Sequence, residues 1–492
     1  MSEIKTLLNQ SSHYFAGQIV IMAASFFSFP ILTRILSVGD YGILGIVMTT
    51  ILVANAVGKF GLPAWIVQFY AEFKSKKQLN IFRSTMLISS FASAAIIALL
   101  FYGVSHLLLG TIFDKNISGL LPFISIIIFT TCANITLTSF FRAEQRTKLY
   151  NLVTIINRYS SLTLGILLTL FIVKGLYGFY FGQVLAGTMV LLVLIYMFNK
   201  NQKITSLTFS PMLFKDSVKY GFPLVWVEMG HLILNYADRY LIQLYLGSIS
   251  LGIYVAGYNL STYVTEIIMY PVNYALTPIY MNMLVNKGEE ETKEFLGKAF
   301  RYFLLIMFPI VFGFIAVGKD LISILATRKY LDSFAVLPYV VIGQSIYACS
   351  LHLNNGLYIR KKTYVVTATI YFACLLNIGL NLVLIPHFGI IGAAVATLIS
   401  NTLYVILITY FAFKEFSFPI DYGRIVRYLG ASVVMYHTVK WVHLNSSLIN
   451  LIGEVLVGAV VYSLLVFLFD GEIRGNLLKF ASTLKRGQKK SV

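Results

Sequence analysis

Hydrophobic stretches of about 20 to 27 residues follow one another along almost the whole chain, and none is followed by a long polar insert. A helix that crosses a bilayer needs roughly 20 apolar residues, so each stretch is long enough to span a membrane. Within lipid, a helix satisfies its own backbone hydrogen bonds. The pattern therefore predicts an all-α polytopic membrane protein with about 14 transmembrane helices.

The predicted spans cover residues 12–36, 42–66, 83–109, 117–140, 151–173, 176–198, 219–246, 250–274, 299–317, 334–356, 364–385, 389–413, 425–443 and 448–469. Composition supports this class, because 58% of the residues are hydrophobic and 12% are charged. No other broad class of protein fits these values.

The basic residues predict the orientation of the chain. If the amino terminus is cytoplasmic, 28 Lys and Arg residues lie in cytoplasmic segments and 6 lie in the opposite loops. The positive-inside rule then places both termini in the cytoplasm. The net charge of +18 is explained by these loops, so it indicates topology rather than nucleic-acid binding, although the basic tail can touch anionic lipids.

The chain also contains an internal repeat. A shift of 214 residues aligns, without a gap, Arg146, Lys148, Tyr150, Gly165, Gly175 and Gly178 with Arg360, Lys362, Tyr364, Gly379, Gly389 and Gly392. The repeat unit is six helices, and an even number makes the two copies parallel, with a site expected between them near the midplane. We predict an N-terminal lobe at 1–198, a C-terminal lobe at 199–413 surrounding a central cavity, an appended helix pair at 414–470 and a basic cytoplasmic tail at 471–492. Two such lobes suit transport by alternating access.

Charged residues inside spans are costly and usually face a cavity or a partner. The residues singled out on this ground are Arg34, Lys59, Arg158, Glu228, Asp238, Arg239 and Glu266. On the 219–246 span, the spacing of Glu228, His231, Asn235 and Arg239 stacks their side chains on one face. Such a stripe indicates a wet cavity, with an internally paired packing seam as the alternative.

The 250–274 span repeats this pattern with Asn259, Tyr263, Glu266 and Tyr270 close to one face. Tyrosines beside amides can stack on sugar rings, although tyrosines are also common at membrane interfaces. Four bases against three acids favour an anionic substrate. Arg34 and Arg239 could instead be structural, paired with Asp40 and Asp238.

Other chemistry finds no support in the sequence. Cys132, Cys349 and Cys374 lie inside spans and are interpreted as small core residues. No group of residues has metal-ligand spacing, and no catalytic motif, phosphate loop or ATP-hydrolysing domain stands out. Active transport would therefore draw on an ion gradient.

Three segments resemble a known family. Residues 30–36, Pro-Ile-Leu-Thr-Arg-Ile-Leu, lead into Asp40, Tyr41 and Gly42 and are similar to the first-helix signature of polysaccharide and O-antigen flippases. These flippases belong to the multidrug/oligosaccharidyl-lipid/polysaccharide exporter superfamily. Residues 238–240 with 247 and 251–254 resemble the opening of that family's second lobe, and residues 389–394 resemble the turn into its twelfth helix.

The resemblance implies a flippase that moves an undecaprenyl-diphosphate-linked oligosaccharide, such as an O-antigen or capsule unit, across the bacterial inner membrane. It implies a basic cavity in which Arg34, Lys59, Arg158 and Arg239 attract the diphosphate or acidic sugars, lined also by Asn235, Asn259, Tyr263 and Tyr270. Coupling to H⁺ or Na⁺, as in an antiporter, would use Glu228, His231, Asp238 or Glu266. Partners would be the lipid-linked substrate, membrane lipids, and a glycan polymerase and chain-length proteins of lipopolysaccharide synthesis.

Three alternatives are compatible with the sequence. A peptidoglycan-precursor flippase handles the same lipid diphosphate. A multidrug exporter of the same superfamily would have a mostly acidic or aromatic cavity. A membrane glycan polymerase or ligase would need a large outer loop, whereas the longest predicted one is only about residues 318–333.

Overall fold

A computed structural model of the chain describes all residues except 1, 109–114, 203–207, 444–446 and 476–492. Side chains are also left undescribed at 2–15, 115–116, 201–202, 264, 267–275, 277–278 and 447. The described residues form helices and connecting turns, with no β-strand among them. The predicted all-α class is therefore confirmed.

The chain forms two compact units. Unit 1 holds residues 1–256 and 367–400, and unit 2 holds residues 257–366 and 401–492. These units follow spatial compactness, whereas the predicted lobes follow the sequence repeat. The division into lobes at residues 198, 413 and 470 stays a prediction.

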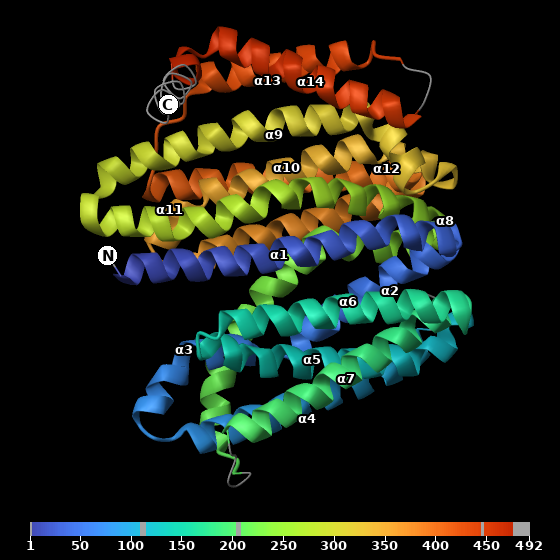
Figure 1. The fold of residues 1–492 in the computed structure, drawn as a ribbon, viewed down its shortest axis with the longest axis vertical. Helices are drawn as coiled ribbons and strands as arrows, with labels where there is room; N and C mark the ends of the chain where they lie inside the picture. The colour runs from blue at the N-terminus through green and yellow to red at the C-terminus, as the bar shows by residue number, and fades with distance from the viewer. Residues whose placement is uncertain (1, 109–114, 203–207, 444–446, 476–492) are drawn as a thin grey trace, which may run out of the picture. The chain divides into compact units, whose positions relative to one another are not determined.

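Unit 1 contains α1 (Ser2–Ile35), α2 (Val38–Gly58), α3 (Leu62–Ser75), α4 (Leu79–Leu107), η1 (Lys115–Leu120), α5 (Leu121–Ala143), α6 (Thr147–Phe171), α7 (Leu176–Gln202) and parts of α8 (Pro211–Lys287) and α12 (Thr363–Glu415). Helices α4, α5, α6 and α7 pack side by side (Figure 1). Phe82, Phe140 and Phe141 form the centre of a core that α3, α4, α5 and α7 share, each no more than 2% exposed.

Unit 2 contains the remainder of α8 and α12 with α9 (Glu289–Leu325), η2 (Arg328–Ala335), α10 (Leu337–Leu353), α11 (Asn355–Ile359), α13 (Tyr422–Val439) and α14 (Ser447–Phe469). Helices α9, α13 and α14 pack together around buried Tyr428 and Met435. The Tyr462 hydroxyl donates to the Leu305 carbonyl at 2.7 Å. At one end of this group, Arg301 donates from both terminal nitrogens to Glu472, at 2.8 and 3.0 Å.

Glycines interrupt the two longest helices. Helix α8 is broken at Gly247 (φ 77°, ψ 180°) and α12 at Gly389 (φ 61°, ψ −141°). The first break falls between two predicted spans and the second at the first residue of the predicted span 389–413. Both glycines adopt the positive φ that side chains disfavour. Gly389 and its repeat partner Gly175 (φ 79°) share a positive φ, as expected of equivalent turns in the 214-residue repeat.

The count of 14 spans stays a prediction. Ten described helices are long and apolar enough to cross a membrane, or up to eleven if the bent pair Arg328–Ala335 and Leu337–Ile359 is counted as one span. The lower figure counts α8 and α12 once each, although each holds two predicted spans.

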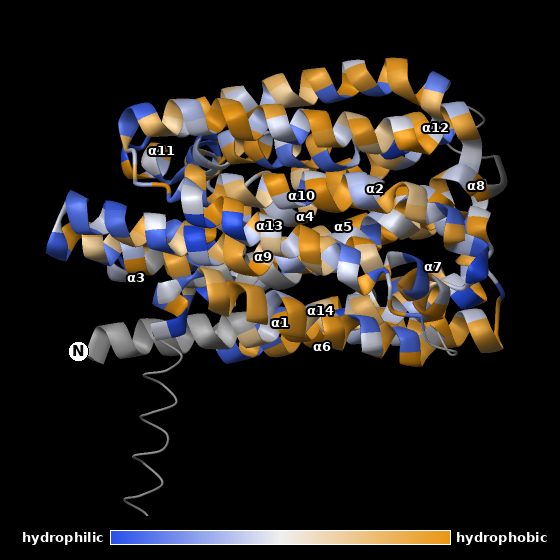
Figure 2. Cartoon of the chain, turned by 90° about the horizontal axis from the view of Figure 1, so that it is seen from above, coloured by the Kyte–Doolittle hydropathy of each residue, from blue (hydrophilic) through white to orange (hydrophobic). Residues whose placement is uncertain are grey.

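Apolar side chains cover much of the helix surface. Leu107, Phe171 and Leu375 are each more than 70% exposed. In Figure 2 hydrophobic residues run along the helices, and hydrophilic residues gather near helix ends such as that of α3. Exposed apolar surface on this scale is stable in lipid and not in water, so the chain is a multi-span membrane protein.

Candidate functional site

The polar residues predicted on α8 lie where α2 crosses this helix, and glycines bring the two backbones together. A Cβ atom on Gly42 would lie 2.1 Å from the Ser248 carbonyl oxygen, and one on Gly61 would lie 2.3 Å from the Gly221 Cα. Only glycine permits such an approach at both ends of the crossing. Side chains between these two contacts are therefore held face to face.

A break in the second predicted span creates the first polar contact. The sequence predicts one helix over 42–66, but α2 ends at Gly58 and α3 begins at Leu62. Phe60 (φ 52°) and Gly61 (φ 71°) have left-handed backbone conformations, and these separate α2 from α3. Gly61 takes this conformation where it presses on α8, a contact that hydrophobic periodicity does not reveal.

Lys59 lies at this break and forms an ion pair with Glu228 of α8. Its Nζ donates to Oε1 at 2.7 Å, with the two side chains 20% and 40% exposed. The pair is neither fully buried nor fully solvated. Its cation can therefore exchange its carboxylate for another anion at moderate cost.

Arg239 lies further along the same face of α8 and is 5% exposed. Its Nη1 donates to Thr49 Oγ1 at 3.1 Å, and its guanidinium stacks on the Tyr236 ring at 4.6 Å from the centroid. The neighbouring Tyr240 hydroxyl shares a hydrogen bond of 2.8 Å with Thr50. In this conformation Arg239 thus connects α8 to α2.

Two predicted residues of the stripe lie between these contacts. Asn235 donates from Nδ2 to the His231 carbonyl at 2.8 Å, and both side chains are partly buried. The four predicted residues do share a helix face, from Glu228 at the α2 break to Arg239 at Thr49. In this conformation the stripe is internally paired, as in the packing seam that was the alternative to an open cavity.

Asp238 is the most deeply buried carboxylate of the predicted set, at 1% exposure. Its Oδ2 accepts hydrogen bonds from the Tyr254 hydroxyl and from Thr397 Oγ1, the latter at 3.4 Å. Among the described residues, its Oδ1 has no hydrogen-bond partner. A buried carboxylate oxygen without a donor favours a proton or a cation beside it.

Sequence reasoning missed the side of this site that α12 supplies. Tyr371 donates to the Trp226 carbonyl at 2.7 Å, and Cys374 to that of Gly230 at 3.1 Å. From the first contact to the second, the residue numbers increase on both helices, so α12 runs parallel to α8 here. Continuing this register along the two helices places Asn381 at the level of Asp238. The clue was an Asn-x-x-x-Asn pair in an apolar span.

Asn377 and Asn381 are 1% and 0% exposed. Asn381 donates from Nδ2 to Asn377 Oδ1 at 2.9 Å. Asn381 Oδ1 and Asn377 Nδ2 have no hydrogen-bond partner among the described residues. The buried oxygens of Asp238, Thr397 and these amides are the ligand type that hard cations prefer.

The other predicted residues of unit 1 lie apart from this crossing. Arg158 donates from Nη2 to Ser25 Oγ at 2.6 Å, which joins α6 to α1. Arg34 is exposed and donates from Nη1 to the Pro30 carbonyl at 2.7 Å. Asp40, its suggested partner, accepts from the Ser37 hydroxyl at the start of α2.

The residues predicted on the following span belong to unit 2. Asn259, Tyr263 and Glu266 are partly buried there, and the side chain of Tyr270 is outside the described set. Next to Asn259, the buried Tyr258 hydroxyl accepts from Gln344 Nε2 at 2.7 Å. Gln344 was not among the predicted residues. Across the described chain, no group of three or more His, Cys, Asp or Glu could hold a metal ion.

Comparison with known proteins identifies a matching family and two relatives. A family model described as polysaccharide biosynthesis protein matches residues 31–335. The probable low-salt glycan biosynthesis flippase Agl15 of Haloferax volcanii is 23% identical over 252 residues, 49% of this chain and 52% of that protein. The uncharacterized membrane protein MJ1068 of Methanocaldococcus jannaschii is 25% identical over 38% of this chain and 37% of its own length. The chain thus aligns with about half or less of these relatives.

Solved structures share the fold over most of the chain. Lipid II flippase MurJ, in an inward closed conformation, superposes with a TM-score of 0.76 at 16% identity, covering 95% of this chain and 99% of that one. An inward-facing multidrug resistance MATE family transporter gives a TM-score of 0.62 at 14% identity, covering 83% and 95%. The relatives and solved structures with a stated activity are flippases or transporters.

Proposed function

Because this chain belongs to the polysaccharide biosynthesis protein family, we propose that it is a flippase for a lipid-linked oligosaccharide. The sugars and the diphosphate of such a substrate cannot cross hydrocarbon unaided, since an unpaired charge or hydroxyl there is costly. A protein that shields the head while the lipid tail stays in the bilayer removes most of this cost. We propose undecaprenyl diphosphate as the carrier and an O-antigen or capsule unit as the glycan.

The half-buried ion pair between Lys59 and Glu228 is the observation that carries this proposal. It joins the break between α2 and α3 to α8, within apolar segments in which an unpaired charge is disfavoured. A diphosphate has more negative charge than one carboxylate and would displace Glu228 from Lys59. We propose that this exchange captures the head, with Asn235 and His231 next along the stripe.

We further propose that Asp238 couples transport to an ion gradient. Its unpartnered Oδ1 lies near Thr397, and by register near the buried amides of α12. This oxygen set can take up H⁺ or Na⁺. Loading it would change the charge beside Arg239, whose contact with Thr49 holds α2 to α8.

The cellular setting is part of the same proposal. We propose that both termini are cytoplasmic, that the protein lies in a bacterial inner membrane, and that two six-helix lobes alternate access around the stripe. A glycan polymerase and chain-length proteins would then use the product on the outer face. The remaining cavity candidates are Arg34, Arg158, Asn259, Tyr263 and Tyr270, with Glu266 as a second candidate for ion coupling.

The test is deletion of the gene in its host, with complementation by wild type and by Lys59→Met. We expect the deletion to lose surface glycan and to accumulate lipid-linked units on the cytoplasmic leaflet. Wild type should restore the glycan and Lys59→Met should not.

Lys76→Met is the matched control, because Lys76 forms a similarly short ion pair with Glu72 on the surface of α3, 2.6 Å apart. Units that reach the outer leaflet without the protein would refute the proposal. Lethality with loss of cell-wall precursor export would indicate the peptidoglycan-precursor flippase. Altered drug resistance with unchanged glycan would indicate the exporter.

A further inference from the structure

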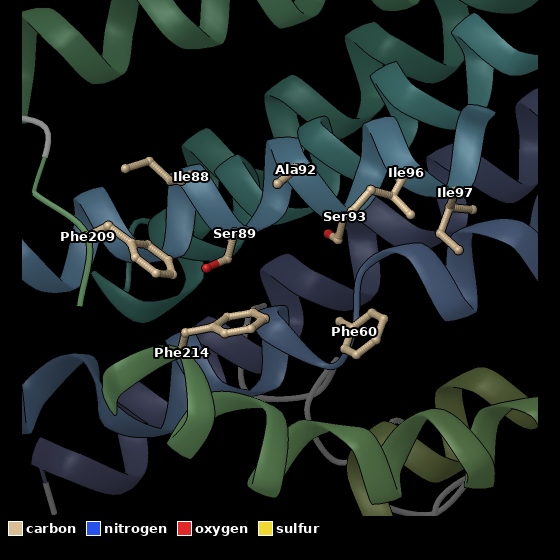
Figure 3. A pocket seen from close by; sticks show the side chains of 9 residues that line it. All are labelled: Phe60, Ile88, Ser89, Ala92, Ser93, Ile96, Ile97, Phe209 and Phe214. Carbon is tan, nitrogen blue, oxygen red and sulfur yellow. The ribbon is translucent and has the colours of Figure 1, made fainter. Parts of the chain in front are cut away.

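Unit 1 contains an apolar groove of about 390 Å³ between α4 and the start of α8 (Figure 3). It is lined by Phe60, Ile88, Ser89, Ala92, Ser93, Ile96, Ile97, Phe209 and Phe214. Phe60 comes from the break after α2, the next six residues from α4, and the last two from the entry to α8. Apart from Phe60, which forms part of the break beside Lys59, none of these residues belongs to the polar site described above.

The groove follows one face of α4. Ser89, Ala92, Ser93 and Ile96 are spaced by three, one and three residues, which places them along a single side of the helix. Three of these side chains are small, so the helix surface is hollow between the larger walls formed by Ile88 and Ile97. The Ile88–Ile97 segment is about 14 Å long at 1.5 Å per residue and begins about 14 Å from the start of α4. This depth lies within the hydrocarbon layer rather than at the interface.

The lining is suited to a hydrocarbon chain. The Ser89 hydroxyl donates to the Thr85 carbonyl at 2.7 Å and that of Ser93 to the Ser90 carbonyl at 3.1 Å, so both are engaged within α4. A cavity with so little polar lining does not hold water stably. Ile96 and Phe209 are 57% and 45% exposed, so the groove opens to the outside of unit 1.

The groove adjoins the cation of the polar site. Phe60, at one end of the groove, directly follows Lys59 in the chain. The Phe60 ring also lies 5.9 Å from that of Phe222 on α8, and Gly61 is fixed against Gly221. The break after α2 therefore turns a cation toward Glu228 and an aromatic ring toward the groove in consecutive residues.

We propose that this groove binds the isoprenoid chain of the lipid-linked substrate while Lys59 holds its diphosphate. The inference rests on the proposed function and adds a second contact to it. An anionic head joined directly to a long apolar chain matches a cation joined directly to an apolar groove. The groove thereby keeps the tail in register with the head as the head moves along α8.

Photolabelling of the wild-type protein in nanodiscs tests the inference directly. The probe is undecaprenyl diphosphate with a diazirine in an isoprene unit near the diphosphate, and labelled peptides are identified by mass spectrometry. We expect label within residues 79–107 and 208–214, competed by unlabelled undecaprenyl diphosphate and not by phosphatidylglycerol. Label elsewhere would overturn the inference. Equal competition by phosphatidylglycerol would also overturn it, because the groove would then hold a bilayer lipid.

A groove-filling variant provides the functional readout. Ser93→Phe occupies the groove, whereas Leu100→Phe adds an aromatic ring at a lipid-exposed site of the same helix, where Leu100 is 56% exposed. We expect Ser93→Phe to reduce labelling and flipping in proteoliposomes by roughly fivefold or more relative to Leu100→Phe, since each displaced methylene loses its burial. Equal flipping by the two variants would refute the groove alone, whereas wild-type protein that is labelled in the groove but does not flip would refute the proposed function.

Discussion

Replacement of Gly61 by alanine should destabilise the protein more than a glycine-to-alanine replacement at any other position in unit 1. Two independent effects act at this position. Gly61 has φ +71°, and a non-glycine residue in the left-handed region costs about 1–2 kcal/mol. In addition, the new Cβ would lie 2.3 Å from the Gly221 Cα and carbonyl oxygen. Backbone atoms cannot rotate away, so overpacking adds about 1–3 kcal/mol.

The expected loss for Gly61→Ala is therefore about 2–5 kcal/mol in the free energy of unfolding. Other glycines separate the two effects. Gly175 has φ +79° with nothing within 4 Å of a Cβ, so Gly175→Ala should lose only the conformational part, about 1–2 kcal/mol. Gly221→Ala retains a helical backbone but meets Gly61 Cα at 2.8 Å, and should lose about 1–3 kcal/mol. Gly103 has neither constraint, and Gly103→Ala should be neutral or gain up to about 1 kcal/mol.

The assay is equilibrium unfolding in mixed micelles by titration with a denaturing detergent, followed by tryptophan fluorescence. The variants are made in a Trp226→Phe, Trp441→Phe background, because the chain has three tryptophans. The remaining Trp65 is 7% exposed and lies in the core next to the Gly61 turn, so its emission should report this region. The expected order of stability is Gly103→Ala first, then Gly175→Ala and Gly221→Ala, and Gly61→Ala last. If Gly61→Ala is as stable as Gly175→Ala, the close crossing of α2 and α8 is refuted.

Three further predictions concern charged groups. Glu228→Gln should leave Lys59 without its carboxylate. The free energy of unfolding should fall by between about 1 kcal/mol, as for a surface pair, and about 3 kcal/mol, as for a buried one. The exchanged pair Lys59→Glu with Glu228→Lys should restore thermal stability but not flipping, and recovery of both would show that Lys59 serves structure alone. Asp238→Asn should remove the acceleration of transport by an imposed H⁺ or Na⁺ gradient in proteoliposomes without unfolding the protein, and unchanged gradient dependence would exclude Asp238 as the coupling site. Burial acts to raise the pKa of Asp470, just beyond the end of α14, but hydrogen bonds from Tyr428 and from two backbone N–H groups outweigh it and lower this pKa below 3.8. A lowered pKa means that this carboxylate stabilises the fold above pH 3.8 and that the contribution is lost as the pH falls through the lowered value; thermal unfolding should show this acid loss in wild type and not in Asp470→Asn.

Hydrophobic periodicity by itself determines the class of this protein. Runs of apolar residues of bilayer length indicate membrane-spanning helices, because a helix satisfies its backbone hydrogen bonds within the same segment. The glycines at the repeat turns are equally readable from the sequence, since Gly175 and Gly389 match at a shift of 214 and share a positive φ. The face formed by Glu228, His231, Asn235 and Arg239 follows from helical spacing alone.

The partners of these residues are decided by tertiary structure. Spacing along one helix cannot indicate that Lys59 faces Glu228, that Thr49 faces Arg239, or that α12 brings Thr397 to Asp238. These contacts depend on where two backbones can approach, which the glycines at 42 and 61 permit. A break inside an apolar span is also invisible to hydrophobic periodicity, because Phe60 and Gly61 continue the apolar pattern while their φ values end the helix. Local sequence sets which face of a helix is polar, and packing between distant helices sets what that face meets.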